Sequence, residues 1–407
     1  MIGSVLADHF TGAASKTLSA VEADAARSNQ HEYNGTAALK ALFGESEQKR
    51  IPARFFRFRE EDETPLTSEG FLSWYDAREN HPTRSEYRLY FSGNDVTRLA
   101  KEGDVIVFAR RPDGTTFVIL TDPAGTVWNQ LAWLFGLGRD AGPAFEFADT
   151  TKAAETGFAA RFILSELGIE EEPPGDQWLD QILARFGNRF PPTAEFSAFA
   201  RGTLPGIRSP DDPDQALLLR MEREEVLFRE LERHIIADRL AAGFTKDGAI
   251  DTDQFIAFSL SVQNRRKSRA GYAFAHHVEA ALTEGNIRYK REATTEKRNA
   301  ADFLFPDEAA YHDPDFPSTQ LRMLAVKTTC KDRWRQVLSE ADRIQTKHLL
   351  TLEPAISLAQ TDEMQSQSLQ LVLPAPLHAT FRPQQQAWLM SFREFLKNVS
   401  EPDTRET

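Results

Sequence analysis

Two residues at the ends of neighbouring apolar segments could act together on a phosphodiester. Asp302 lies at the start of the segment ADFLFP, and Lys327 lies near the end of RMLAVKTT; each segment is typical of a short strand. A carboxylate offers hard oxygen ligands to a divalent metal, and a lysine can orient water or offset the negative charge that develops on phosphate. Aspartate and lysine at strand ends are also common in proteins without such a site, so the pair alone leaves both interpretations open.

A second metal-binding carboxylate is needed for this chemistry. In a PD-(D/E)xK-like arrangement it commonly lies two residues before the lysine, but this chain has Ala325 there, which cannot bind a metal. We expect a helix from 331 to 343, and Glu340 would lie about two and a half turns from its start. From there it could point back over the strand ends. Asp302 and Glu340 are therefore candidate ligands for a divalent metal, although the spacing alone does not establish such a site.

The elements expected around these residues alternate between strands and helices. Apolar residues at three- and four-residue spacing predict helices from 214 to about 241 and from 253 to about 284, and Gly243 is expected to end the first. Further strands are predicted at 287–292, 302–305, 322–329, 348–352 and 369–374, with helices at 331–343, 356–363 and 384–396. This order predicts a mainly α/β domain over 211–407, with a central mixed sheet and helices on both faces.

The first part of the chain has a different pattern. Residues 1–25 predict an amphipathic helix, and four short strands rich in aromatic and β-branched residues are expected after it, at 54–59, 86–92, 104–110 and 115–122. The turn signal RPDG (111–114) predicts that the last two form a hairpin. We expect a small barrel or half-open sheet over 1–150, of the α+β class, followed by a linker with short helices over 151–210.

Composition limits the class of protein. The chain has 407 residues, which favours two domains, and no apolar run long enough to cross a bilayer. Its start lacks the features of a secretory signal, and its single cysteine, Cys330, excludes an intramolecular disulfide, so a cytoplasmic location without a membrane partner is expected. The net charge of -13 argues against a polyanionic partner, yet the stretches 264–269, 288–298 and 331–335 are locally basic.

Four longer segments resemble one family. NRRKSRAG (264–271), ADFLFP (301–306), AYHDPDFP (310–317) and MLAVKTTCKDRWRQVLSEAD (323–342) are similar to the catalytic domain of EcoRII-type restriction endonucleases, over about 211–381. This resemblance implies that Asp302 binds the metal, that Lys327 is the catalytic lysine and that Glu340 is the carboxylate relocated to the helix. It implies a Mg²⁺-dependent type II endonuclease that cuts double-stranded DNA.

The same resemblance implies how DNA is read. The triplet Lys331, Asp332 and Arg333 matches the family's reader of the outer C·G pairs, because Lys or Arg donates to guanine and Asp accepts from cytosine N4. Members recognise CCWGG or close variants and flip the central bases out of the helix. Further DNA contacts are expected from the basic residues of NRRKSRAG, namely Arg265, Arg266 and Lys267.

Two positions depart from the family pattern. A glutamate is usual where this chain has Ala275, and a proline is usual at Ala301, before the metal-binding aspartate. The first change removes an acidic residue from the catalytic cluster. It is compatible with a natural change, with compensation by Glu279 one turn later, or with an engineered inactive form. The second concerns how the strand begins more than the chemistry.

The first domain resembles the family's effector-binding domain, a pseudobarrel similar to the plant B-three-type DNA-binding fold. The resemblance rests on SNQHEYNG (28–35), TRSEYRLYF (83–91) and the stretch 104–122. Arg84, Glu86 and Arg88 match an alternating set that reads bases in relatives, and residues at i, i+2 and i+4 of a strand share one face. An exposed edge strand with alternating charges would give the same pattern.

The function expected is therefore a homodimeric enzyme, because a near-palindromic site requires a reader of two-fold symmetry. Its first domain would bind a second, effector copy of DNA and relieve autoinhibition of the catalytic cleft. Two alternatives remain. One is a catalytically disabled DNA-binding protein, as Ala275 suggests. The other is a nuclease whose first domain reads a modified base.

Overall fold

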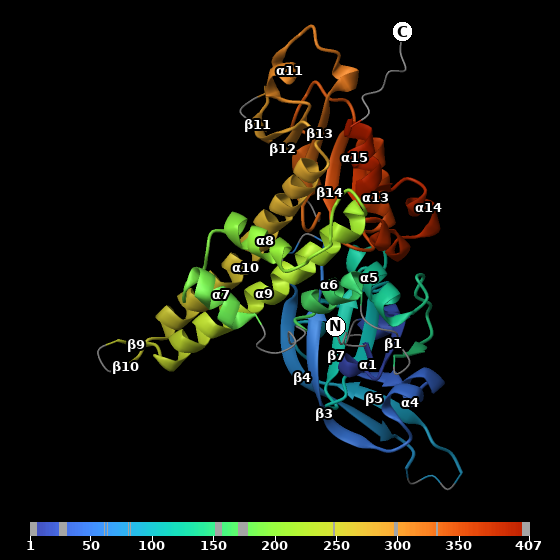
Figure 1. The fold of residues 1–407 in the computed structure, drawn as a ribbon. Helices are drawn as coiled ribbons and strands as arrows, with labels where there is room; N and C mark the ends of the chain where they lie inside the picture. Colours follow the sequence, from blue (N-terminus) through green and yellow to red (C-terminus); the bar gives the residue numbers. More distant parts are fainter. Residues whose placement is uncertain are drawn as a thin grey trace. The chain divides into compact units, whose positions relative to one another are not determined.

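The chain forms two compact units (Figure 1). The amino-terminal unit comprises Ile2–Glu170 together with Pro354–Gln360, and the carboxy-terminal unit comprises Glu171–Glu353 and Thr361–Thr407. The computed structural model describes residues 6–23, 31–60, 62, 64–79, 81, 83–150, 157–169, 178–246, 249–296, 300–330 and 333–400. Each unit is considered by itself below.

The amino-terminal unit is built on an eight-stranded mixed sheet. In spatial order its strands are β2 (Glu32–Asn34), β5 (Tyr87–Phe91), β4 (Leu66–Asp76), β3 (Gln48–Arg57), β7 (Thr116–Thr121), β6 (Val105–Arg110), β1 (Gly12–Thr17) and β8 (Glu146–Asp149). Neighbours are antiparallel except β3 and β7. The predicted hairpin is confirmed: Arg110 pairs with Thr116, and Gly114 adopts φ +86° in the turn between them. The four predicted strands correspond to β3, β5, β6 and β7.

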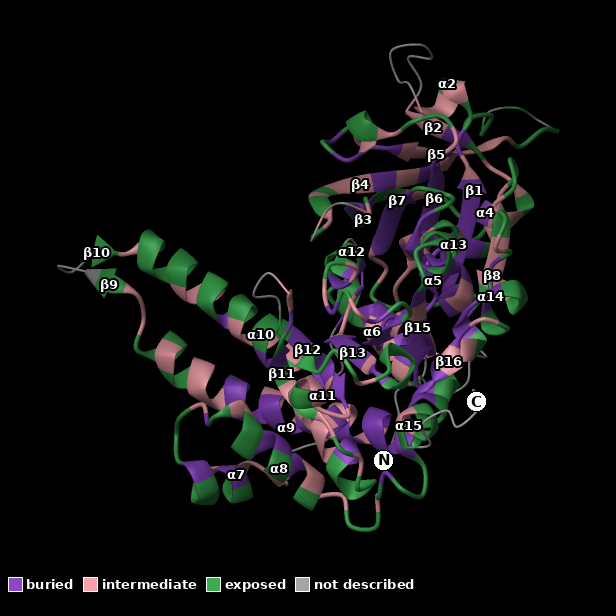
Figure 2. Ribbon diagram, turned by 90° about the horizontal axis from the view of Figure 1, so that it is seen from above, coloured by how far each residue is buried: buried purple, intermediate pink, exposed green. Residues whose placement is uncertain are grey.

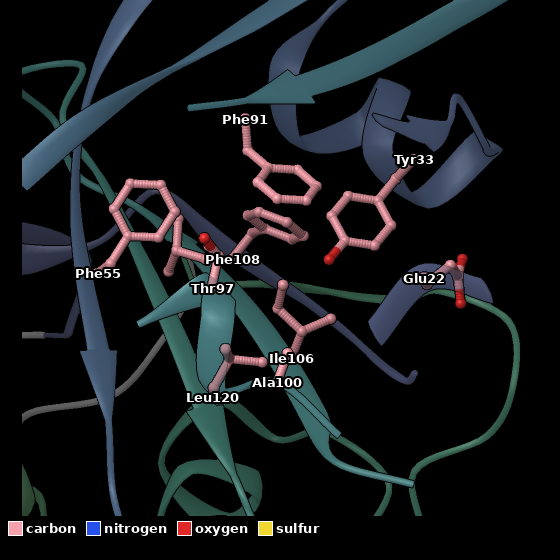
Figure 3. Close-up of a pocket in the computed structure, with 10 residues that line it drawn as sticks. Glu22, Tyr33, Phe55, Phe91, Thr97, Ala100, Ile106, Phe108 and Leu120 are labelled. Atoms are coloured by element: carbon pink, nitrogen blue, oxygen red, sulfur yellow. The ribbon is translucent and has the colours of Figure 1, made fainter. Parts of the chain in front are cut away.

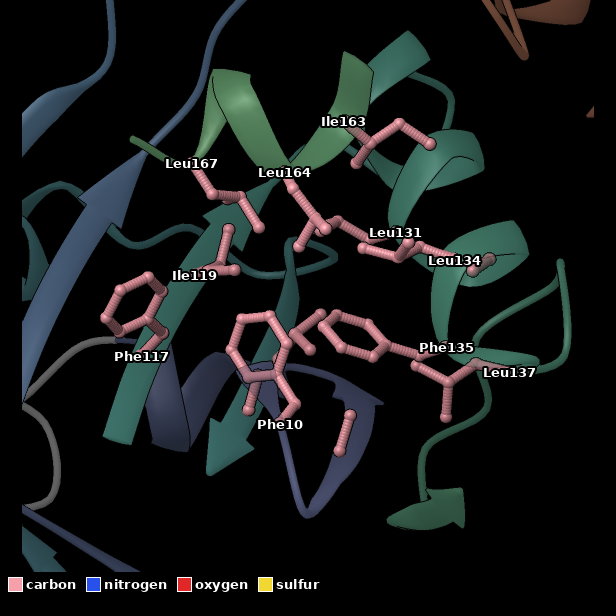
Figure 4. Packing of buried hydrophobic residues seen from close by; sticks show 14 of the residues in the cluster. Phe10, Phe117, Ile119, Leu131, Leu134, Phe135, Leu137, Ile163, Leu164 and Leu167 are labelled. Carbon is pink, nitrogen blue, oxygen red and sulfur yellow. The ribbon is translucent and has the colours of Figure 1, made fainter. Parts of the chain in front are cut away.

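Both faces of this sheet are buried. Along β6, Val105, Val107 and Ala109 point into one core, and Ile106 and Phe108 point into the other. The first core is covered by α5 (Thr126–Phe135) and α6 (Phe158–Glu166). Figure 4 shows leucines of both helices packed in one cluster with Phe117 and Ile119 of β7 and with Phe10. The second core lies under α4 (Ala37–Phe43). A strand buried on both sides is apolar at consecutive positions, which explains the continuous apolar runs in this region.

A small cavity lies in the second core (Figure 3). Aromatic side chains line much of it, among them Tyr33, Phe55, Phe91 and Phe108. It is only large enough for about one water molecule. We therefore regard it as a packing void rather than a ligand site.

The helix predicted over residues 1–25 is wrong. The described part of this segment contains α1 (Leu6–His9), then β1, then α2 (Ala20–Ala23). β1 lies between β6 and β8, where small side chains are required: a Cβ added at Gly12 would lie 2.9 Å from Phe147 Cε2. Pairing with two strands outweighs the helical spacing of the apolar residues.

The carboxy-terminal unit begins with four helices, α7 (Leu179–Phe186), α8 (Thr193–Gly202), α9 (Pro213–Ala241) and α10 (Thr252–Glu284). The two long helices are confirmed. Asp212 and Asp251 cap their first turns through side-chain oxygens, and Gly243, at φ +70°, follows the end of α9. Phenylalanines and leucines of α7, α8 and α9 form their shared core. Within the described chain, these helices and all others are too short or too polar to cross a membrane.

The C-terminal end of α9 and the N-terminal end of α10 carry exposed apolar side chains. A two-stranded hairpin, β9 (Thr245–Lys246) and β10 (Ala249–Ile250), joins these ends. Five large apolar residues there are 48–82% exposed, and Figure 2 shows the ends of both helices as largely exposed. We call this set the arm tip; it consists of Leu240, Ile250, Phe255, Ile256 and Leu260.

The rest of the unit is a six-stranded mixed sheet, as predicted. Its order is β11 (Lys290–Thr294), β12 (Ala300–Phe305), β13 (Arg322–Lys327), β14 (Lys347–Thr351), β15 (Leu369–Leu373) and β16 (Met390–Ser391), with the first two pairs antiparallel and the others parallel. The remaining helices are α11 (Glu308–His312), α12 (Trp334–Val337), α13 (Leu358–Ser366), α14 (Pro383–Gln386) and α15 (Phe392–Ser400). The helix predicted at 384–396 is wrong in part, because β16 divides it so that Met390 can pair with Val372.

Candidate active site

Asp302 and Lys327 meet at the edge of the sheet where β12 begins and β13 ends. The two strands are antiparallel, with Phe303 opposite Leu324, so the start of one lies beside the end of the other. Asp302 Oδ2 accepts hydrogen bonds from Lys327 Nζ at 2.9 Å and from the Val326 backbone N–H at 2.7 Å. The side chains of Asp302 and Lys327 are 33% and 28% exposed. This contact was predicted, and it leaves both groups accessible to a ligand from solvent.

Glu340 lies in a turn, so the prediction that it lies on a helix is wrong. α12 ends at Val337, and Glu340 follows in a turn, with its N–H donating to the Val337 carbonyl at 3.1 Å. The next residue, Ala341, has φ +50°, which ends helical geometry.

Three consecutive backbone N–H groups explain this turn. Those of residues 341, 342 and 343 donate to side chains from elsewhere in the unit: Thr295 Oγ1 at 3.4 Å, Glu296 Oε2 at 3.0 Å and the Tyr311 hydroxyl at 3.3 Å. Tyr311 also donates to Glu296 at 2.6 Å. These three acceptors were missed by the sequence analysis. AYHDPDFP, which contains Tyr311, stood out as a motif, but nothing in it indicated this role.

The carboxylate of Glu340 is poorly satisfied. Its Oε2 is buried and has no hydrogen-bond partner among the described residues. Burial, and then the negative charge of Asp302, raises the pKa of Glu340 to about 7, against the smaller opposing effects of Lys327 and Lys347. A cation between Glu340 and Asp302 would remove both penalties. These hard oxygen donors therefore suit Mg²⁺, which proteins often hold with one or two carboxylates.

No larger ligand cluster surrounds them: within the described ranges, no group of three or more His, Cys, Asp or Glu residues could hold a metal. Ala275 lies half-buried on α10 and contributes no carboxylate. Glu279, one turn later, accepts from Arg291 at 2.5 Å and from the Tyr289 hydroxyl at 3.4 Å. Its charge is therefore already balanced by Arg291.

An open pocket of about 300 Å³ lies beside the turn. Its lining comprises Glu296, Tyr311, His312, Pro314 and Arg343, residues that include two of the acceptors holding the turn. Hydrogen bonds to Tyr311 and to backbone N–H groups keep the pKa of Glu296 low despite its partial burial. The pocket thus lies beside the turn that follows Glu340, and its lining carries the Glu296 carboxylate and the Arg343 guanidinium.

The residues expected to read the outer base pairs follow β13 directly. Lys331 and Asp332 lie outside the described residues. Arg333 is described and exposed, and its backbone N–H donates to the Cys330 carbonyl at 2.8 Å. The predicted reader thus begins within a few residues of Lys327.

The basic stretch of α10 is used largely within the unit. Arg265 lies 4.1 Å from the centre of the Phe190 ring, and Arg266 donates to the buried carboxylate of Glu232 at 2.6 Å. Lys267 is exposed. Of the three predicted DNA contacts, Lys267 has the freest access to solvent.

In the amino-terminal unit, Arg84, Glu86 and Arg88 do not all belong to a strand, contrary to the prediction. β5 starts at Tyr87, and Arg84 and Glu86 lie in the preceding loop. In this loop the Asp76 side chain accepts from the Glu86 N–H at 2.7 Å. Arg84 is exposed, whereas Arg88 is paired with Glu86.

Comparison with known proteins places the carboxy-terminal unit. Residues 228–396 match the family model described as EcoRII C terminal, a range that contains Asp302, Lys327 and Glu340. Over 239 residues the chain is 39% identical to the type II restriction enzyme EcoRII of Escherichia coli. That alignment covers 58% of this chain and spans only 57% of the length of that relative.

Two solved protein–DNA complexes are similar to part of the chain. The PspGI–substrate DNA complex has a TM-score of 0.43 at 15% identity, covering 52% of this chain and 92% of that one. Metal-depleted Ecl18kI with uncleaved DNA has a TM-score of 0.45 at 16% identity, covering 57% and 86%. Residues 228–396 thus match the EcoRII C terminal family model, and over part of its length the chain is similar in sequence to a type II restriction enzyme.

Proposed function

We propose that this protein is a Mg²⁺-dependent type II endonuclease that hydrolyses DNA phosphodiesters at a CCWGG-like site. The observation that carries the proposal is the sheet edge where Lys327 and Asp302 form an ion pair beside a carboxylate oxygen of Glu340 that has no hydrogen-bond partner among the described residues. Two carboxylates and a lysine at one accessible edge supply the ligands and the positive charge that phosphodiester hydrolysis needs.

Asp302 and Glu340 would hold the cation. When bound, Mg²⁺ acts as a Lewis acid on the phosphate and lowers the pKa of water. Lys327 would move its ammonium from Asp302 to a phosphate oxygen, where it offsets the charge that develops as the bond breaks. The Val326 N–H keeps Asp302 oriented during this exchange, since its bond to Oδ2 does not depend on the lysine.

DNA reading is assigned to the segment after β13 and to α10. Lys331, Asp332 and Arg333 would contact the outer C·G pairs in the major groove, with central bases flipped from the helix. Arg265, Arg266 and Lys267 would contact the backbone. For Arg266 this requires release from Glu232.

A homodimer is proposed because a single chain carries one such edge and a duplex has two strands to cut. The arm tip supports this. Its apolar residues are held on a stiff support, since Phe244 packs edge-on against Phe255 at 5.4 Å and Arg239 lies 4.2 Å from the Phe244 ring. A second copy that covered the arm tip would remove this apolar surface from water.

The amino-terminal unit is proposed to be an effector-binding pseudobarrel that takes a second copy of DNA and keeps the enzyme inactive until it is bound. Such regulation requires effector DNA to bind the active state more tightly than the inactive state. Deleting residues 1 to about 180 should then raise the cleavage rate; an unchanged rate would disprove autoinhibition.

Two other functions are separable by simple comparisons. A catalytically disabled DNA-binding protein, suggested by Ala275, would bind CCWGG DNA but cut it only after Ala275→Glu. A reader of a modified base would be indicated if the isolated amino-terminal unit preferred methylated DNA to unmethylated DNA of the same sequence.

The proposal is tested by incubating plasmid DNA that contains CCWGG sites with the parent and the Ala275→Glu variant, in Mg²⁺ and in EDTA. A plasmid with the outer C·G pairs of each site replaced serves as the matched substrate. We expect Mg²⁺-dependent cutting of the first plasmid only. If neither protein cuts the first plasmid in Mg²⁺, the proposal is wrong.

A further inference from the structure

A buried carboxylate holds the segment between the proposed catalytic lysine and the proposed DNA reader. Glu353 lies two residues beyond the end of β14 and is 3% exposed. Its Oε2 accepts a hydrogen bond from the Cys330 backbone N–H at 2.6 Å. Burying a carboxylate is costly unless it is hydrogen-bonded, and a bond from a neutral donor to a charged acceptor is among the stronger protein hydrogen bonds. The hydrogen bond from Cys330 therefore offsets part of the free-energy cost of burying the Glu353 carboxylate.

The sheet register shows what this contact fixes. β13 and β14 are parallel, and Lys327 pairs with Thr351. The segments that follow these two strands stay aligned beyond that pair. Thr351 Oγ1 donates to the Thr328 carbonyl at 3.3 Å, and Glu353 accepts from the Cys330 N–H. The segment from Lys327 to Cys330 is thus fixed along the end of β14.

Cys330 is held on both sides of its Cα. Its N–H donates to Glu353, and its carbonyl accepts from the Arg333 N–H at 2.8 Å. Its side chain has no exposed surface. The Arg333 backbone is thus anchored to Cys330, and the position of Cys330 relative to Lys327 depends on Glu353.

We propose that Glu353 is a positioning residue that sets the placement of Arg333 relative to Lys327, and thereby links base recognition to cleavage. This inference rests on the proposed function. Without Glu353 the segment would keep its sequence but lose its fixed spacing from the catalytic edge. A displacement of about 1 Å at an active site can lower a rate by roughly 10²-fold. The cleavage rate should therefore fall mainly on cognate DNA, where base contacts place the scissile phosphate at the catalytic residues.

The first measurement is the ratio of cleavage rates on CCWGG DNA and on DNA with one outer C·G pair replaced. Glu353→Ala should lower this ratio about tenfold or more, chiefly through a slower cognate rate. Glu353→Gln keeps an acceptor oxygen for the Cys330 N–H, although a neutral one, and should recover part of the ratio. If the parent cuts specifically and Glu353→Ala keeps the same ratio, the inference is wrong.

The second measurement needs no activity. Cys330 is the single cysteine of the chain, and burial raises the pKa of its thiol, so it should react slowly with a thiol reagent. Loss of the Glu353 contact should expose it more often and raise its labelling rate in the full chain by about tenfold. Unchanged labelling would overturn the inference even if the proposed function failed.

A matched control separates local positioning from general loss of stability. Asp214, also 3% exposed, accepts from the backbone N–H groups of Ala375 and Phe392 at 3.0 and 2.9 Å in the same unit. Asp214→Ala should lower the melting temperature, as Glu353→Ala does, yet leave the cleavage ratio and the labelling of Cys330 near parent values. Equal changes in both variants would contradict a specific role for Glu353.

Discussion

Each unit carries a charged cluster beside a strand end, and the two clusters differ in how well their charges are satisfied. In the carboxy-terminal unit, burial and the charge of Asp302 raise the pKa of Glu340 to about 7, and one of its oxygens has no partner. In the amino-terminal unit, Arg88 donates to Glu32 at 3.1 Å and to Glu86 at 2.8 Å. The bond from Arg88 lowers the pKa of Glu86.

This difference separates a cluster whose negative charges are not balanced from one whose charges are balanced, although Arg88 Nε also has no hydrogen-bond partner among the described residues. The Glu340 cluster holds like charges together at a free-energy cost, which a bound cation would remove. The cluster around Arg88 is already neutralised by its own residues. DNA could use Arg88 only by displacing its partners, whereas the exposed Arg84 nearby is accessible at once.

The largest expected effect comes from removing the positively charged side chain of Lys327 from the Glu340 cluster. Lys327→Ala should lower the cleavage rate of CCWGG DNA by about 10²- to 10³-fold, because the site would lose the ammonium group that offsets the charge developing on the phosphate. Single-turnover cleavage measures this, with Lys397→Ala, an exposed lysine of α15, as the control. Equal rates for the two variants would remove Lys327 from the catalytic site.

Adding a carboxylate to the same cluster should have the opposite effect. Ala275→Glu restores the acidic residue that the family resemblance expects, and we predict a rise in cleavage rate of about tenfold, or about 1.4 kcal/mol in activation free energy. The rate at saturating Mg²⁺ is the measurement. No change would show that two carboxylates are sufficient.

The unsatisfied charge should also be visible in stability. The folded pKa of Glu340, about 7, exceeds its ordinary value of 4.5, so ionising it destabilises the fold as pH rises from 4.5 through 7. Without metal, Glu340→Gln should therefore stabilise the protein at pH 8 by about 1–2 kcal/mol, after allowance for partial exposure, and have little effect at pH 4.

Mg²⁺ provides the matching control for that experiment. At pH 8 it should raise the melting temperature of the parent more than that of Glu340→Gln, because the variant lacks one ligand. Identical shifts would mean that the cation binds elsewhere.

The smallest expected effect concerns the second cluster. Arg84→Ala should weaken DNA binding to the amino-terminal unit by about 1 kcal/mol, roughly fivefold, if Arg84 contacts a base. Arg98→Ala removes an arginine that is 75% exposed and paired with Asp95, and should have less effect. Unchanged affinity of Arg84→Ala for every DNA tested would exclude the predicted role.

Sequence reasoning was most successful where local patterns and tertiary contacts agree. The long helices α9 and α10 have capping aspartates and regular apolar spacing, and the β6–β7 hairpin has its turn residues. Asp302 and Lys327 were placed correctly because each lies at the end of an apolar strand, where little depends on distant residues.

It failed where distant groups decide the backbone. The segment after Lys331 was predicted as one helix, but α12 ends at Val337. Side chains of Thr295, Glu296 and Tyr311 then accept from the N–H groups of residues 341–343 and hold the turn that follows Glu340. β4 was missed because it is only partly buried and carries Glu69 and Gly70, which local rules do not favour in a strand. No local signal encodes either outcome.

Cleavage of a CCWGG duplex in Mg²⁺ tests most directly whether Asp302 belongs to the catalytic centre. The Asp302→Asn substitution is made both in the parent and in the Ala275→Glu variant, and each product is compared with the same protein that keeps Asp302. We predict site-specific cutting in at least one of the two backgrounds. In that background Asp302→Asn should lower the cleavage rate by about 10²-fold or more. Site-specific cutting that persists undiminished in Asp302→Asn would contradict the assignment of this sheet edge as the catalytic centre.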